Sequence, residues 1–215
     1  MKNFFLQNKI FLILYLVFFI TGAFVIYYYE KGDEIIYISS FHTPALNVFF
    51  RAISKMAEAP VFALIILVGA VTGFGKGVVL LVTYLTNGIL TQFLKLQVFT
   101  NQARPLLFFQ DKISLTPVPG VDSLHDNSLP SGHTSTAFAI WFMLSIFTKN
   151  KNWSYLYFSL ALLVGVSRVY LLQHFFRDIY FGSLLGVAVS TLVFLIFVKS
   201  KFYHSLSWRN KKLLS

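Results

Sequence analysis

The chain has 215 residues, of which 56% are hydrophobic and only 12% are charged, with a mean hydropathy of +0.68. Soluble domains carry about 25% charged residues, so this composition excludes an ordinary water-soluble globule and indicates a membrane protein. The absence of cysteine excludes disulfides, thiolate zinc sites and a cysteine nucleophile. The net charge of +10 is compatible with nucleic-acid binding until its distribution is considered.

The first half of the chain predicts three membrane spans. Residues 10–29 form an apolar run of 20 residues, about the length that crosses a bilayer core. We prefer a span to a signal peptide because the run is long and no small-x-small cleavage site follows it. A short helix lying at the membrane interface is expected to begin at Pro44. A second span at 60–72, which is short and so begins earlier or sits off-centre, a turn at 73–77 and a third span at 78–96 follow.

The second half of the chain predicts a long loop and three more spans. The loop is long enough to be either functional or disordered. In order, we expect a loop at 97–129, a span at 131–147, a basic turn at 148–152, and spans at 153–172 and 179–198. The sequence thus predicts an all-α integral membrane protein: a six-span transmembrane bundle formed by residues 1–198, with a basic cytoplasmic tail at 199–215.

The charges are distributed unequally between the two sides of such a bundle, in which both termini share a side. That side receives no acid and ten positive residues: Lys2, Lys9, Lys76, Lys149, Lys151, Lys199, Lys201, Arg209, Lys211 and Lys212. The other side receives the remaining positive residues and all eight acids: Glu30, Asp33, Glu34, Glu58, Asp111, Asp122, Asp126 and Asp178. Lys and Arg favour the cytoplasmic side, so both termini are predicted to be cytoplasmic. The basic side then fits anionic lipid headgroups better than nucleic acid.

Charged side chains interrupt the apolar pattern at 167–178, between two predicted spans. Arg168, His174 and Asp178 lie there, and charges at membrane depth are costly and usually functional. His174 and Asp178 are four residues apart, so a continuous helix would place both on one face. A carboxylate at that spacing can hold an imidazole in one tautomer and support its positive charge. We therefore predict that His174 is a nucleophile and that Asp178 orients it.

Two further polar clusters are expected on the same outer face. Lys95 and Arg104 flank the end of the third span, and Pro130–His133 opens the fourth. Lys95, Arg104 and Arg168 supply cations for phosphate oxygens, and arginine can bind them bidentately. The free N–H groups at a helix start make an anion site, to which glycine allows close approach.

This chemistry suits phosphoryl transfer. His174 can attack phosphorus and form a phosphohistidine that water then hydrolyses. His133 can protonate the leaving oxygen and later activate the water. Because no carboxylate cluster suggests a bound metal, we expect metal-independent catalysis without a cofactor.

These clusters resemble the signatures of the phosphatidic acid phosphatase type 2 family of membrane phosphatases, which shares its site design with vanadium haloperoxidases. The signatures are K-x6-R-P, P-S-G-H and S-R-x5-H-x3-D. The second and third match at 130–133 and 167–178 without change. The first departs, because eight residues separate Lys95 from Arg104 and Gln97 stands at the six-residue spacing. We assign Lys95 because it ends a span and the following turn can absorb two residues.

The resemblance implies a role for each matching residue. The residue matching His174 is the phosphate nucleophile, that matching His133 is the general acid, and that matching Asp178 supports the nucleophile. The residues that would bind phosphate are Lys95, Arg104, Ser131, Gly132 and Arg168.

The implied protein is a lipid phosphatase of a bacterial-type inner (plasma) membrane, with its active site on the periplasmic or extracellular side. The resemblance suggests undecaprenyl pyrophosphate, phosphatidylglycerol phosphate or phosphatidic acid as the substrate. A lipid A phosphatase and a lipid phosphotransferase stay open as alternatives within the family. A non-catalytic phospholipid-binding or transport protein is the alternative from another class, and the complete set of His133, His174 and Asp178 argues against it.

Several other features have simpler explanations. His42, His125 and His204 are expected to be interfacial side chains. Arg177 either pairs with a lipid phosphate or sits at headgroup level. The G-x3-G pattern of Gly182 and Gly186 allows close helix packing. It equally fits ordinary packing within the bundle, so we infer no dimer from it.

Overall fold

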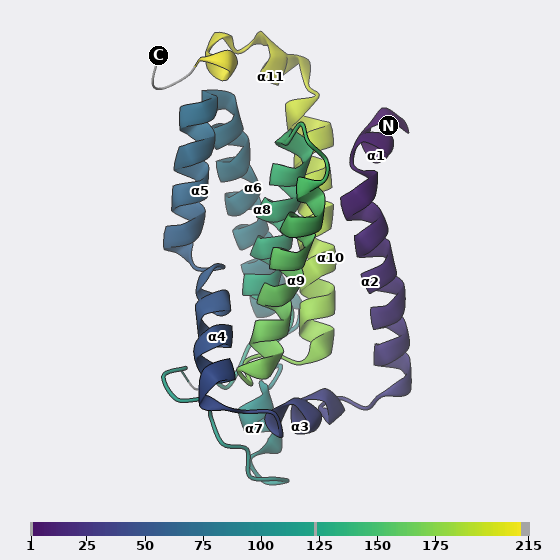
Figure 1. Cartoon of the computed structure of the whole chain (residues 1–215), viewed down its shortest axis with the longest axis vertical. Coiled ribbons are helices and arrows are strands. Elements are labelled where there is room, and N and C mark those ends of the chain that lie inside the picture. The colour runs from purple at the N-terminus through teal and green to yellow at the C-terminus, as the bar shows by residue number, and fades with distance from the viewer. Residues whose placement is uncertain (1, 123, 212–215) are drawn as a thin grey trace.

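The apolar runs of the sequence form helices that stand side by side along the long axis of the molecule (Figure 1). The computed structural model describes residues 2–122 and 124–211. In chain order the helices are α1 (Lys2–Gln7), α2 (Lys9–Tyr28), α3 (Asp33–Ser39), α4 (Pro44–Lys55), α5 (Ala59–Thr72), α6 (Phe74–Phe93), α7 (Pro105–Phe109), α8 (Gly132–Phe147), α9 (Trp153–Tyr170), α10 (Phe176–Leu192) and α11 (Lys201–Ser205).

Three short segments complete the described chain. The π-helical segments η1 (Leu94–Val98) and η2 (Val193–Val198) extend α6 and α10, and a 3-10 turn, η3 (Ser207–Asn210), follows α11. The predicted basic tail therefore begins with helical turns, and the carbonyl of Lys211 accepts a hydrogen bond from the N–H of Phe74 at the start of α6. Lys212 and the rest of the predicted tail lie outside the described residues.

The helices are those of a multi-pass membrane protein. Within the described residues, three helical segments are long and apolar enough to cross a membrane, namely Lys9–Tyr28, Phe74–Val98 and Phe176–Val198. The pair α4 and α5, bent by 47°, makes a fourth candidate if it is one span. α8 is apolar but has only 16 residues, and α9 carries serines and an arginine. Length and composition thus support three or four spans, and the predicted number of six stays a prediction.

The predicted interfacial helix at Pro44 is wrong in its placement. α4 begins at Pro44 as expected, with the Thr43 hydroxyl accepting from the N–H of Leu46 at 3.3 Å. It does not lie across the end of the bundle, because it continues towards α5 along the long axis (Figure 1). Its polar face, which includes Arg51 and Lys55, lines a cavity. If the bent pair is one span, that span begins at Pro44, well before residue 60.

The predicted turn at 73–77 is also wrong. α6 begins at Phe74, so Gly73 alone separates it from α5. Gly77 packs against α5 so closely that a Cβ there would lie 2.7 Å from the Cα of Ala70. Gly77 serves close helix packing, and its turn propensity is overridden by that contact.

The core is centred on α8, which packs against α6, α9 and α10. Gly182 and Gly186 of α10 face the backbone of α8. A Cβ built on Gly182 would lie 2.7 Å from the carbonyl oxygen of Ser131, and one built on Gly186 would lie 2.3 Å from that of Ser135. The G-x3-G pattern therefore permits close packing inside the bundle, and it holds the first turns of α8 and α10 together.

Replacing Gly186 by alanine is expected to lower the stability of the protein by about 1–3 kcal/mol, because rigid backbone atoms must move to make room. The matched control is Gly88→Ala in α6, where a Cβ would meet no atom within 4 Å. Alanine gains about 1 kcal/mol of helix propensity over glycine there. Thermal unfolding in detergent checks both variants, and equal midpoints for the two would contradict the close packing.

Candidate active site

His174 lies between two helices, in the interval that the predicted spans at 153–172 and 179–198 leave open, and the continuous helix that would place it on one face with Asp178 does not form. α9 ends and α10 begins on either side of a turn at residues 171–175, and His174 is in that turn. The N–H groups of Gln173 and His174 both donate to the carbonyl oxygen of Arg168, at 2.9 and 3.2 Å. Because α9 and α10 run in opposite directions (Figure 1), the chain has to reverse here, and the backbone bonds to Arg168 close the turn.

Asp178 reaches His174 from the first turn of α10. Its Oδ2 accepts the N–H of Phe175 at 3.0 Å, accepts the hydroxyl of Ser128, and lies 3.5 Å from Nδ1 of His174. The other carboxylate oxygen, Oδ1, has no hydrogen-bond partner among the described residues, and Nε of Arg177 is 3.9 Å away. A carboxylate that caps a helix start is thus also the one that faces the imidazole.

The contacts of the His174 ring determine which nitrogen carries the proton. Nη1 of Arg104 lies 3.3 Å from Nε2 of His174, and a guanidinium can only donate. Nε2 is therefore the acceptor, and Nδ1 carries the hydrogen that points towards Asp178. The ring is 1% exposed, and this burial holds the pKa of His174 well below its usual value, so the ring is neutral. The tautomer leaves a lone pair on Nε2.

Arg104 is held by one segment of the long loop and by the His174 turn. Its N–H donates to the carbonyl oxygen of His125 at 2.7 Å, and Nε donates to that of Asp126 at 2.8 Å. Nη1 also donates to the carbonyl oxygen of Gln173 at 3.0 Å. These bonds fix the arginine so that its guanidinium reaches the His174 turn.

Lys95 is inside the bundle, whereas Gln97 is exposed. Nζ of Lys95 donates to the carbonyl oxygen of Asn127 at 2.7 Å. The lysine lies in η1, where the N–H of Phe99 donates to the carbonyl oxygen of Leu94 in a π-helical bond of 2.7 Å. A π-turn accommodates extra residues at a helix end and often occurs at functional sites.

Arg168 is buried at the end of α9 and reaches across to α4. Nη1 donates to the hydroxyl of Ser54, and Nη2 lies 3.4 Å from Oε1 of Gln173. Nε of Arg168 has no partner within the described part of the chain. The side-chain amide of Gln173 also donates to the carbonyl oxygen of Asp122 at 2.8 Å, and the backbone carbonyl oxygen of Gln173 accepts from Arg104, so this residue links Arg104, Arg168 and the loop.

The Pro130–His133 cluster starts α8, as predicted. The hydroxyl of Ser131 is the N-cap, 3.4 Å from the N–H of Thr134, and Ser131 is fully buried. Its own N–H donates to the carbonyl oxygen of Asp178 at 3.0 Å, which joins this helix start to that of α10. Gly132 and His133 are half-buried, and His133 faces a cavity.

That cavity has a volume of about 640 Å³ and lies beside the His174 turn. Its charged and titratable lining residues are Arg51, Lys55, Glu58, Asp122, His133 and Arg168. His174 is not among the lining residues, because Arg104 and the turn cover its ring.

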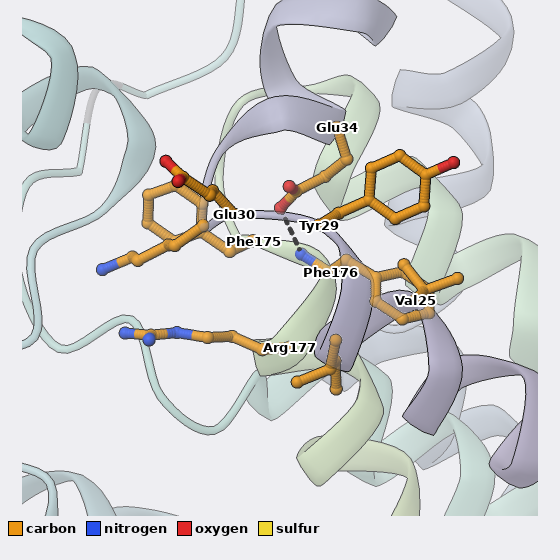
Figure 2. Close-up of a pocket in the computed structure, with 9 residues that line it drawn as sticks. Val25, Tyr29, Glu30, Glu34, Phe175, Phe176 and Arg177 are labelled. Atoms are coloured by element: carbon orange, nitrogen blue, oxygen red, sulfur yellow. Dashed lines mark hydrogen bonds between the residues drawn. The ribbon is translucent and has the colours of Figure 1, made fainter.

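A second, smaller cavity of about 170 Å³ lies behind the turn and is shown in Figure 2. Oε1 of Glu34 accepts the N–H of Phe176 there at 2.8 Å, which ties α3 to the start of α10. Arg177 also lines this cavity, and its Nη2 donates to the side chain of Gln102 at 3.1 Å. The hydrogen bonds of Glu34 and Arg177 around this cavity support the turn from outside.

Three residues of this network were missed by sequence reasoning: Ser54, Ser128 and Gln173. Gln173 precedes His174, and Ser128 lies two residues before Pro130, but no local pattern marks either as buried and bonded. Ser54 is 114 residues from its partner Arg168. Among the described residues, no group of three or more His, Asp or Glu side chains could hold a metal ion.

The chain is similar to known proteins in sequence and in fold. The sequence model of the PAP2 superfamily matches residues 76–202, which include every predicted site residue. The solved structure of LpxE from Aquifex aeolicus superposes with a TM-score of 0.67 at 27% identity, over 79% of this chain and 98% of that one. That of a transmembrane PAP2-type phosphatidylglycerolphosphate phosphatase from Bacillus subtilis gives 0.61 at 25% identity, over 90% and 94%.

One curated relative is also similar over a shorter stretch. The bacitracin transport permease protein BcrC of Bacillus licheniformis is 40% identical over 81 residues. The matched stretch makes up 38% of this chain and spans 39% of the length of that relative.

Proposed function

Because the chain belongs to the PAP2 superfamily of membrane phosphatases, we propose that it hydrolyses a lipid phosphate or pyrophosphate through a phosphohistidine at His174. The observation that carries this proposal is the state of the His174 ring. A neutral imidazole with its proton on Nδ1 towards Asp178 has its Nε2 lone pair available for attack. Nη1 of Arg104 lies 3.3 Å from Nε2 and donates to that lone pair. Arginine is also a side chain that binds phosphate.

The first step forms a bond between Nε2 of His174 and phosphorus. As phosphate oxygens take over the N–H groups of Arg104, Nε2 is released to attack, and the bond from phosphorus to the leaving oxygen breaks. Arg104, Arg168 and Lys95 are buried cations that would balance the charge on the phosphoryl oxygens. Ser131 and Gly132 would add the N-terminus of α8, although the Ser131 hydroxyl already caps the helix.

His133 is proposed to move the proton. It faces the cavity from the first turn of α8, where it would donate a proton to the leaving oxygen. In the second step, water attacks the phosphohistidine, its proton passes to His133, and the P–N bond breaks to release inorganic phosphate. The positive charge that His174 carries while bonded to phosphorus is supported by Asp178.

The proposed topology has six spans, with α2, the bent pair α4 and α5, α6, α8, α9 and α10 each crossing the membrane. Both termini lie at one end of the bundle, and α3 and α7 lie at the other, on the side of the His174 turn (Figure 1). The positive residues of the first end would face the cytoplasm. The site would then open to the periplasmic or extracellular side of the inner membrane, with residues 1–198 as the enzyme and 199–215 as a basic tail.

The substrate candidates are undecaprenyl pyrophosphate, phosphatidylglycerol phosphate and phosphatidic acid, with lipid A phosphatase and lipid phosphotransferase activity as alternatives. The similarity to LpxE and to a phosphatidylglycerolphosphate phosphatase supports action on a lipid phosphate. The similarity to a protein named as a transport permease keeps non-catalytic lipid binding as a second candidate.

The purified protein is expected to release phosphate from at least one lipid in a panel of prenyl pyrophosphates, glycerophospholipids and lipid A, and to do so in excess chelator. The proposed chemistry needs only side chains of this chain, so removing divalent cations should leave the rate unchanged. Tight lipid binding without phosphate release would favour the binding or transport protein. Activity that disappears in chelator and returns with a metal would contradict metal independence.

A further inference from the structure

The cavity beside the His174 turn has one wall made by α4, a helix that none of the three signatures includes. Arg51, Ser54 and Lys55 of α4 all line it. Their spacing of three and four residues places them on one face of the helix. A cavity of about 640 Å³ is several times larger than one phosphate group needs, so this wall faces a different part of a bound lipid headgroup.

This wall lies next to the bend between α4 and α5, which the proposed topology treats as one broken span. α4 ends at Lys55, α5 begins at Ala59, and the two are bent by 47° at that junction. Figure 1 shows the junction partway along the length of the bundle, between its two ends. Helix breaks at membrane depth are tolerated where they line a water-filled cavity, and in transporters they mark binding sites. A charged residue at such a break indicates a functional site.

α4 is joined directly to the proposed phosphate site. The hydroxyl of Ser54 accepts a hydrogen bond from Nη1 of Arg168. This bond holds one turn of α4 next to the guanidinium that would bind the transferred phosphoryl group. Lys55 is the next residue and lines the same cavity. A ligand bound at Arg168 would therefore extend along α4 and past Lys55.

Among the described residues, the side chain of Lys55 has no hydrogen-bond or ion-pair partner, unlike that of Arg51. Arg51 donates to the carbonyl oxygens of Asn47 and Pro119, at 3.3 and 2.9 Å, which fastens the loop to α4. Glu58 and Asp122 share the cavity with Lys55. Across the described residues, however, the only ion pairs within 4.0 Å involve Asp178, so neither acid neutralises the lysine. An anionic group of the ligand would neutralise the charge of Lys55.

We propose that Lys55 binds a second phosphate of the lipid headgroup, the one that is not transferred to His174, and so makes the enzyme selective for lipids with two phosphates. This proposal rests on the proposed function. The second phosphate can be directly linked to the first, as in a prenyl diphosphate, or separated by a glycerol, as in phosphatidylglycerol phosphate. Both present the same charge to Lys55.

The test compares two pairs of lipids with matched tails: a prenyl diphosphate with its monophosphate, and phosphatidylglycerol phosphate with phosphatidic acid. The readout is the ratio of kcat/KM within each pair. Lys55→Gln is expected to lower this ratio about tenfold in one pair, which is the typical loss for one charge-assisted contact. The pair that responds tells whether the two phosphates are directly linked.

Two variants serve as controls. Lys55→Arg keeps the charge and should retain the ratio. Lys112→Gln removes a lysine that stacks over the ring of Phe108, with Nζ 3.7 Å from its centroid, and that does not line the cavity. It should leave both ratios unchanged. Unchanged ratios in Lys55→Gln for both pairs would overturn the proposal, while phosphate release itself would still support the proposed function. No release by the wild-type protein from any lipid would instead refute the proposed function.

Discussion

Replacing His174 by alanine is expected to lower phosphate release at least about 10³-fold, with little change in folding. The nucleophile contributes the covalent step, and removing such a residue from a catalytic group typically costs several orders of magnitude. The ring is buried between Arg104 and Asp178, each of which contacts a different ring nitrogen and loses that partner in the variant. The measurement is single-turnover phosphate release from the best lipid substrate of the panel.

The matched control is His125→Ala. His125 lies in the same loop system, but its imidazole is exposed, and its contact with Arg104 is made by the backbone carbonyl, which alanine retains. This variant should work at the wild-type rate. A His174→Ala protein with the wild-type thermal midpoint and the wild-type rate would contradict the nucleophile assignment.

Asp178→Asn should cause the second largest loss, about 10³- to 10⁴-fold in kcat, by analogy with the loss of the orienting carboxylate in other imidazole-based enzymes. The amide keeps the shape but removes the charge that supports the His174 imidazolium. It also presents an N–H group where Ser128 and the N–H of Phe175 now donate. KM should change less than kcat, because Asp178 is not expected to contact the lipid.

Ser128→Ala distinguishes the effect of the orientation of the Asp178 carboxylate on activity from the effect of its charge. It removes one donor from Oδ2 of Asp178 and leaves the charge in place, so a loss of about tenfold is expected. Ser128→Thr, which keeps the hydroxyl, should recover most of the activity. If Asp178→Asn proved no worse than Ser128→Ala, the carboxylate would have only a packing role.

The fold could be predicted from the sequence wherever the signal was local. The boundaries of α2, α8 and α9 follow from uninterrupted apolar runs and polar breaks, and the predicted and observed ends agree within a few residues. The all-α membrane architecture and the family are confirmed. The role of α4 could not be predicted, because its polar face looks the same in sequence whether it lies against headgroups or an internal cavity.

The site shows the same division between local and distant contacts. The residues of the signatures could be named from the sequence, and the structure brings His174, Asp178 and Arg104 into direct contact. The break between the two helices at His174 follows from the predicted span ends, but the tight turn that closes on the carbonyl oxygen of Arg168 could not be read from the sequence. Ser128 was missed because its partner is 50 residues away. Such contacts depend on how α8 and α10 pack and leave no periodic pattern.

The central claim is that phosphorus bonds to His174 during turnover. The most direct measurement is to mix the enzyme with a lipid labelled in its transferable phosphate, quench the reaction in alkali within the first turnover, and map the labelled peptide by mass spectrometry. Phosphohistidine survives alkali, so the account predicts one labelled histidine, His174, and no label in the Asp178→Asn protein above its residual rate. Phosphate release at the full rate with label on His133 only, or with no labelled residue at all, would contradict it.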